Sequence, residues 1–177
     1  MEKIFKEITK KGKSFIIRST DAAEIERVLM LQEEVCAVLE KKDWFVKITR
    51  EEVTESTRED ITLGAYDGDK LIGFALIVKN RSCDRNLGEK FGFKPKDCFT
   101  ADSSFVHPDY RGFGLQGEFL DIARDEAVKN GASSVWATVS PENVYSHRNC
   151  DKRGYTVFKS AISIYGGRIR DVLVLKF

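Results

Sequence analysis

The sequence predicts a single mixed α/β domain whose elements follow the order β-α-α-β-β-β-α-β-α-β-β. Three observations lead to this fold class. The chain has 177 residues, which is enough for one well-buried core and too short for two ordinary domains. Strand-length apolar runs are interspersed irregularly with amphipathic stretches, so the order is not a regular β-α alternation. Turn signals at Asp67-Gly68-Asp69 and at Gly166-Gly167 join neighbouring strands into hairpins. We therefore expect one domain over residues 1–177.

The first third of the chain predicts one strand and two helices. Residues 15–19, FIIRS, are a short apolar strand, and Thr20 or Asp21 can cap the helix that follows. The apolar residues of that helix fall near helical spacing: Ile25, Val28, Leu29, Leu31, Val35 and Leu39. Thr49-Arg50-Glu51-Glu52 has the spacing of a capping box and predicts a short second helix.

The middle of the chain predicts a hairpin, a loop and a long strand. Residues 61–78 contain two apolar runs on either side of Asp67-Gly68-Asp69. Residues 79–97 are polar and contain glycine, so we expect a long loop. Residues 98–106, CFTADSSFV, are the next strand.

The last part of the chain predicts two helices and three strands. A helix with one apolar face starts around Gly112 and ends at Asn130-Gly131. The strand SSVWATV is followed by a short helix over residues 143–153, which Gly154 closes. Residues 155–177 form two strands around Gly166-Gly167.

Composition and charge exclude several classes of protein. The 29 Lys and Arg against 28 Asp and Glu give a net charge of +1, so we expect neither nucleic acid nor an anionic membrane as a partner. The charged N-terminus lacks the apolar segment of a signal peptide, and the longest apolar runs are too short to span a bilayer. The four cysteines are widely spaced, which favours free thiols in the cytoplasm. Two histidines are too few for a His-rich metal site, and we expect no metal.

The stretch YRGFGLQGEFL contains a G-x-G-x-x-G pattern at Gly112, Gly114 and Gly117. In a dinucleotide-binding fold these glycines directly follow the first strand, and an acidic residue ends the next one. Here five residues separate the preceding strand from Gly112, the unit lies past the middle of the chain, and the next strand ends without an acid. We therefore reject dinucleotide binding.

The same stretch still has the properties of a phosphate site. Gly112 and Gly114 allow the backbone to come close to a ligand. The helix beginning there offers unpaired N–H groups and the positive end of its dipole, and Arg111 adds a fixed cation. A diphosphate would satisfy all three features. A tight strand-to-helix turn with a solvated arginine is the alternative.

VHPDYRGFGLQ resembles motif A of the GNAT superfamily of acyl-CoA N-acyltransferases, (Q/R)-x-x-G-x-(G/A) after a strand ending V-x-P. Arg111 and Gly114 match, whereas Gln116 stands where Gly or Ala is usual. SPENVYSHRNCDKRGYTVF resembles motif B, and the resemblance extends over essentially the whole chain. It implies a mostly antiparallel mixed sheet of about six to seven strands and about four helices, with a cofactor cleft between two splayed strands.

The resemblance also implies a set of residues that bind coenzyme A. The backbone of Phe105 and Val106 would pair with the pantetheine arm, and an N–H near Val106 would stabilise the oxyanion. Asn143 and Ser146 would contact the arm or its thiol end, although both can equally serve as helix caps. The pyrophosphate would be held by the loop Arg111, Gly112, Phe113, Gly114, Leu115 and Gln116.

Two residues are candidates for the proton transfers. Asp102 lies in the strand before motif A, where family members often carry an acid, and is the candidate base. Cys150 occupies the position of the tyrosine that commonly serves as the acid. A neutral thiol can donate a proton, but it is shorter than a phenol, so we favour a packing role for Cys150.

The resemblance implies an N-acetyltransferase that uses acetyl-CoA and a primary amine of a small molecule or peptide. Trp44-Phe45 and residues 165–168 are expected to contact this acceptor. The missing tyrosine favours a second hypothesis, a domain on the same fold that binds acyl-CoA without turnover. A nucleotide-binding regulatory domain is a remote third reading. The sequence leaves the acceptor undefined and a homodimer open.

Overall fold

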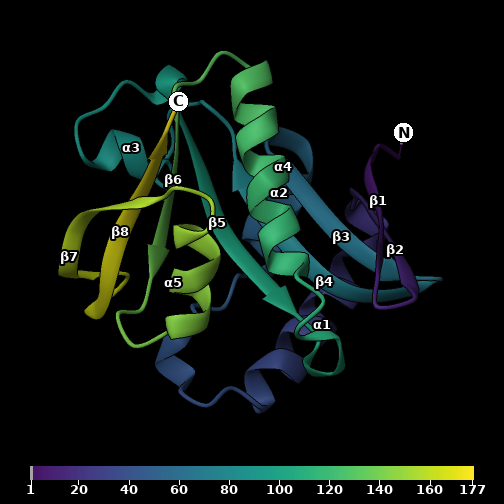
Figure 1. Ribbon diagram of the computed structural model, residues 1–177. Helices are drawn as coiled ribbons and strands as arrows, with labels where there is room; N and C mark the ends of the chain where they lie inside the picture. Colours follow the sequence, from purple (N-terminus) through teal and green to yellow (C-terminus); the bar gives the residue numbers. More distant parts are fainter. Residues whose placement is uncertain (1) are drawn as a thin grey trace.

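The computed structural model describes residues 2–177 and contains one open eight-stranded sheet with helices on both faces (Figure 1). The strands are β1 (Ile4–Lys10), β2 (Lys13–Ser19), β3 (Ile61–Asp67), β4 (Lys70–Val78), β5 (Cys98–Val106), β6 (Ser134–Val139), β7 (Thr156–Ile164) and β8 (Arg168–Lys176). The helices are α1 (Ile25–Ala37), α2 (Arg50–Glu59), α3 (Leu87–Lys90), α4 (Leu115–Lys129) and α5 (Val144–Asp151). The strand order is β1-β2-β3-β4-β5-β6-β8-β7, and only β5 and β6 are parallel.

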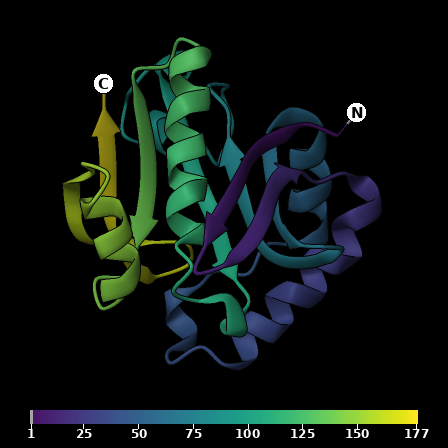
Figure 2. The ribbon, with the colours of Figure 1, turned by 45° about the vertical axis from the view of Figure 1, so that its right-hand side comes forward.

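The sheet separates two hydrophobic layers. One face is covered by α4 and α5, in front of the sheet in Figures 1 and 2, and its core includes Phe99, Leu115 and Phe119. The opposite face is covered by α1, α2 and α3. Side chains alternate between these faces along each strand, so a strand residue's position decides which layer it enters.

Local sequence signals account for the helix starts near the site. The capping box at the start of α2 is present: the Thr49 side chain accepts from the Glu52 amide, and the Glu52 carboxylate accepts from the Thr49 amide. At the start of α4, Gly114 is the N-cap residue with φ +76°, a backbone conformation that residues with a Cβ adopt at a cost.

The predicted fold class is confirmed, with more elements than expected. The sheet has eight strands because residues 4–10 form an additional edge strand, and α3 makes a fifth helix inside the segment expected to be a loop. The helix expected near Gly112 begins at Leu115, after a 3₁₀ turn over Pro108–Tyr110. The hairpin turns around Gly68 and Gly166-Gly167 are both present.

A β-bulge and the divergence of two strands open the centre of the sheet. Leu76 pairs with Ser103 and Ile77 with Ala101, so Asp102 is the extra residue on β5. The pairing of β5 with β6 ends at Ala101 and Ala137, and beyond this point the two strands diverge (Figure 1). Asp102 therefore lies at the point where the gap begins.

Candidate functional site

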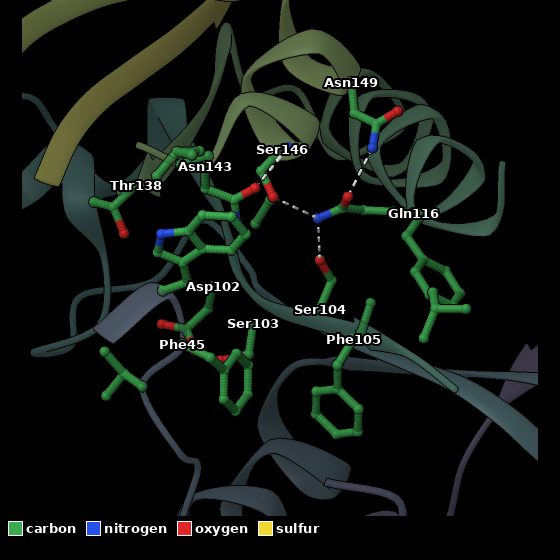
Figure 3. Close-up of a pocket in the computed structure, with 18 of the residues that line it drawn as sticks. Phe45, Asp102, Ser103, Ser104, Phe105, Gln116, Thr138, Asn143, Ser146 and Asn149 are labelled. Carbon is green, nitrogen blue, oxygen red and sulfur yellow. Dashed lines mark hydrogen bonds between the residues drawn. The ribbon is translucent and has the colours of Figure 1, made fainter. Parts of the chain in front are cut away.

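A cavity of about 1010 Å³ passes through the gap between β5 and β6. The cavity has lining residues on both faces of the sheet, and the bulge at Asp102 lies between the two groups. The α4-side chamber is lined by Ser104, Gln116, Ser146, Asn149 and the glycine loop. The α1-side chamber is lined by Phe45, Arg85, Asp102, Ser103, Phe105, Thr138 and Tyr165. In Figure 3, Gln116, Ser146 and Asn149 lie above Ser104, whereas Asp102, Ser103, Phe45 and Phe105 lie in the lower part of the picture.

The glycine loop presents unpaired backbone donors to the α4-side chamber. Gly112 and Gly114 both have positive φ, +80° and +76°. Among the described residues, the amides of residues 112–116 donate no hydrogen bond, whereas the Arg111 amide donates to the Pro108 carbonyl at 3.3 Å. Free amides at the positive end of a helix form a site for an anion.

Cations from two parts of the chain surround this loop. Arg111 is exposed and makes no ion pair with the described residues. Lys10 Nζ lies 3.1 Å from where a Cβ on Gly114 would be, and Lys11 Nζ lies 3.7 Å from the corresponding point on Gly112. These lysines are not among the residues predicted from the sequence, because β1 was not predicted either. The K-K-G-K run around Gly12 was the available signal for the β1–β2 turn.

A polar cluster joins α4 to β5 and α5 in the α4-side chamber (Figure 3). Gln116 Nε2 donates to the hydroxyls of Ser104 and Ser146, both at 3.2 Å. Gln116 Oε1 accepts from Asn149 Nδ2 at 2.7 Å. The side-chain oxygen of Asn143 caps α5 by accepting from the Ser146 amide. The amide of Ser146 is thus used in the cap, while its hydroxyl lines the chamber.

The α1-side chamber contains an ion pair at the bulge. Arg85 Nη2 donates to Asp102 Oδ2 at 2.8 Å, and the Ser103 hydroxyl donates to the same oxygen at 3.1 Å. Arg85 also donates to the hydroxyl of Ser56. Asp102 Oδ1 accepts no hydrogen bond from the described residues. The carboxylate is therefore held in place through one oxygen, and the other can accept a bond from a ligand.

The last hairpin and the segment before α2 close the same chamber. The Thr138 hydroxyl donates to the Tyr165 hydroxyl at 3.3 Å, and burial raises the pKa of Tyr165, so it is a neutral phenol. Asp43 pairs with Arg170 at 3.4 Å. The Trp44 ring packs edge-on against Tyr145, with ring centroids 6.5 Å apart. These contacts fix the aromatic segment Trp44-Phe45 over the cavity.

Cys150 lies at the inner end of α5 and is 3% exposed. It belongs to the hydrophobic core between α4, α5 and the sheet, although it also touches the cavity. Burial, with a smaller contribution from Asp151, raises the pKa of its thiol to about 12. The thiol is therefore neutral, and it packs as a small apolar side chain.

Apart from Phe113 and residues 166–168, the residues singled out from the sequence line one cavity. Phe113 packs instead against Phe15 in the core, with ring centroids 5.2 Å apart. Asp102 and Cys150 are on opposite sides of the sheet, Asp102 beside Arg85 and Cys150 in the α4–α5 core. Phe105 points into the α1-side layer, against Phe45 and Phe74, and Val106 packs on the α4 side. Arg85 and Thr138 were missed, because a partner 17 residues away, or 27 residues away in the turn of the last hairpin, leaves no local pattern.

The comparisons with known proteins agree with this geometry. The model of the acetyltransferase (GNAT) family matches residues 24–155, about three quarters of the chain. The chain belongs to this family. It is similar to the GNAT domain of S. lividans PAT, with 20% identity, coverage of 96% of both chains and a TM-score of 0.71.

Two further structures share the fold. A candidate acetyltransferase from Salmonella typhimurium, solved with its cofactor acetyl-CoA, has 20% identity and a TM-score of 0.67, over 92% of this chain and 93% of that one. The ribosomal-protein-S18-alanine N-acetyltransferase from Escherichia coli has 16% identity and a TM-score of 0.67 over the same shares. The comparison with curated proteins found no match.

Across residues 2–177, no helix combines the length and apolar character needed to cross a membrane.

Proposed function

We propose that this protein is an N-acetyltransferase that transfers an acetyl group from acetyl-CoA to a primary amine of a small molecule or peptide by direct attack. The observation that carries this proposal is the row of unpaired amides at residues 112–116, which opens onto the gap between β5 and β6. Membership of the acetyltransferase (GNAT) family supports the same activity.

The loop and the strand together fit the two halves of coenzyme A. The amides of residues 112–116, with Arg111, Lys10 and Lys11 nearby, would hold the phosphates through charge-assisted bonds. Beyond Ala101 the edge of β5 is unpaired with β6, so the backbone of Phe105 and Val106 can bind the pantetheine arm as an added strand would. The four residue steps from Val106 to Asp102 span roughly 14 Å. The arm would therefore carry the thioester toward the bulge.

The amine would approach from the α1-side chamber, through the gap. Asp102 is the proposed base, because its Oδ1 is open while Arg85 and Ser103 hold Oδ2. Attack of the neutral amine on the thioester carbonyl forms the amide bond and releases the thiol, so positioning and oxyanion stabilisation are the main contributions of the protein. The oxyanion donor is proposed to be a backbone N–H near Val106. Trp44, Phe45 and Tyr165 would contact the acceptor.

A domain that binds acyl-CoA without turnover is the second candidate. The specific observation in its favour is Cys150, a buried neutral thiol at the position where the family commonly has its acid. A thiol-release assay with acetyl-CoA over amines, polyamines, amino acids and peptides separates the two candidates. Release with some acceptor supports the enzyme, whereas tight binding without release over the whole panel supports the binding domain.

The glycine loop gives the most direct test of cofactor binding. Gly114→Val should abolish coenzyme A binding, measured by calorimetry. A β-branched residue adopts φ +76° only at a high energetic cost, and its side chain would enter the space beside the loop amides. Arg111→Ala should weaken binding less, since one exposed cation is only one of several contacts. Unchanged affinity in a Gly114→Val protein with native circular dichroism would falsify the assignment of the loop.

A further inference from the structure

Gln116 stands at the motif position where the resembling family usually has Gly or Ala, and its side chain has a defined place. The carboxamide lies between α4, β5 and α5 and makes three hydrogen bonds (Figure 3). Its partners come from two elements: Ser104 is on the part of β5 that is not paired with β6, Ser146 is in the first turn of α5, and Asn149 is one turn further along α5. A glycine or alanine would make none of these contacts.

The direction of these hydrogen bonds determines what the chamber presents to a ligand. Asn149 donates to Gln116 Oε1, which orients the carboxamide with its two N–H bonds toward the serines. Each serine oxygen therefore accepts a bond from Gln116. Neither hydroxyl donates to any of the described residues. Because a hydroxyl has one proton to give, both Ser104 and Ser146 retain a proton for an acceptor in the chamber.

We propose that Gln116 is a positioning residue that makes the hydroxyls of Ser104 and Ser146 donors to carbonyl oxygens of the pantetheine arm. This inference rests on the proposed function, in which the arm follows β5 from the glycine loop to the bulge. The arm carries amide carbonyls and, in acetyl-CoA, the thioester carbonyl, and all of them are acceptors. Ser104 and Ser146 flank that route on β5 and α5, so their donated protons meet acceptors of the arm.

The test compares two probes that differ only by the arm: coenzyme A and 3′-phosphoadenosine 5′-diphosphate. Calorimetry gives the affinity for coenzyme A divided by the affinity for the fragment. This ratio is measured for the wild-type protein, for Gln116→Met and for Gln116→Glu. Methionine keeps the volume and removes the hydrogen bonds, so the ratio should fall about five- to tenfold, the effect of losing neutral hydrogen bonds. Glutamate accepts from both serines and so turns their protons away from the arm. The ratio should fall further, by about ten- to a hundredfold.

A double-mutant cycle shows whether Gln116 acts through the serines. In a Ser104→Ala/Ser146→Ala protein, adding Gln116→Met should change the ratio less than twofold. A full-sized effect in that background would overturn the proposal. The affinity for the phosphate fragment reports the integrity of the glycine loop in every variant, so a general loss of structure lowers both affinities and leaves the ratio unchanged.

Two other outcomes also count against the proposal. An unchanged ratio in Gln116→Met or Gln116→Glu, with wild-type affinity for the phosphate fragment, overturns it, and tighter coenzyme A binding would show that Gln116 obstructs the arm. If the wild-type protein binds neither probe, the proposed function fails and this inference fails with it. Binding by the wild-type protein with an unchanged ratio in the variants removes the inference alone.

Discussion

Cys150 illustrates how burial limits the chemistry of a single residue. Its side chain packs in the core between α4 and the sheet, and its raised pKa, about 12, keeps the thiol neutral over the range where enzymes work. A neutral thiol is a proton donor only if it reaches the leaving sulfur. Because only 3% of its surface is exposed, Cys150 is better placed to pack in the core than to contact the leaving sulfur.

We predict that Cys150→Ala keeps acetyl transfer within about tenfold of the wild-type kcat. The departing coenzyme A thiol has a pKa of roughly 8 to 9, so water can protonate it without a dedicated acid. Steady-state kinetics with the acceptor found in the thiol-release assay measures this.

A dedicated acid is worth on the order of 10² to 10⁴ in rate. A hundredfold drop in kcat, with KM for acetyl-CoA and the fold intact, would therefore identify Cys150 as the acid. Cys98→Ala is the matched control, because Cys98 is a buried cysteine in the α3-side core. If it reduces activity equally, the effect is general destabilisation.

The surroundings of Asp102 and Gln116 show which features of single residues can be predicted from the sequence and which cannot. The glycine loop was predictable, because Arg111 and Gly114 match a local pattern and their geometry follows from the helix start. The Asp102–Arg85 pair and the Gln116 cluster were not, since each depends on side chains brought together by tertiary structure. The departure at Gln116 was visible in the sequence, but its partners were not.

At the scale of elements, the edge hairpin β1–β2 is fastened to the start of α4. Glu118, in the first turn of α4, is 6% exposed and accepts hydrogen bonds from Lys6 at 2.6 Å and from Lys10 at 2.5 Å. Burial alone would raise the pKa of Glu118, but the bonds from Lys10 and Lys6 outweigh it and lower the pKa. This contact holds the β1–β2 turn, and its lysines, beside the glycine loop.

We predict that Glu118→Gln lowers the free energy of unfolding by about 1–3 kcal/mol at pH 7. This is less than the usual cost of breaking a fully buried ion pair, because both lysines are partly exposed. Since the folded-state pKa is lowered, the ion pair stabilises the fold above the unfolded-state value of about 4.3. That stabilisation is lost as the pH falls through the folded-state pKa. In urea unfolding, the difference in stability between variant and wild type should therefore be smaller at pH 3 than at pH 7. An equal difference at both would mean that packing, not charge, is lost.

Element prediction succeeded where the signal is local. The Thr49–Glu52 capping box and the Gly68 turn appear as expected because a few neighbouring residues specify them. β1 was missed because IFKEITK exposes most of its residues at the sheet edge and has no clear apolar face. The helix α3 has only four residues, and besides a local cap at Asn86 its start depends on long-range contacts such as the Leu87 amide bonding to Thr100.

At the scale of the whole molecule, the cavity passes through the sheet between the layers of α4–α5 and α1–α3. A ligand that spans the gap would contact β5, α4 and α5 together. Its binding free energy would then add to the stability of the fold as a unit.

We predict that coenzyme A at a hundred times its Kd raises the Tm by about 5 to 10 °C. Such saturation adds about 2.7 kcal/mol, and each kcal/mol shifts the Tm of a chain of this size by about 2–4 °C. Differential scanning calorimetry measures the shift. Acetyl-pantetheine at the same concentration should give a much smaller one, because it lacks the phosphates that the glycine loop would hold. Equal shifts would place the binding energy in the arm and contradict the role of the loop.

Under the proposed function, the bulge at Asp102 would let one strand serve two recognition tasks that can change separately. Beyond it, Ser104 and Val106 face the α4 side, while Ser103 and Phe105 face the α1 side. A substitution at either of the last two positions alters the surface that would meet the acceptor and leaves the opposite lining of the strand untouched. Under the proposed function, acceptor preference could thus diverge by point mutation along β5 while donor recognition on the same five residues is inherited unchanged.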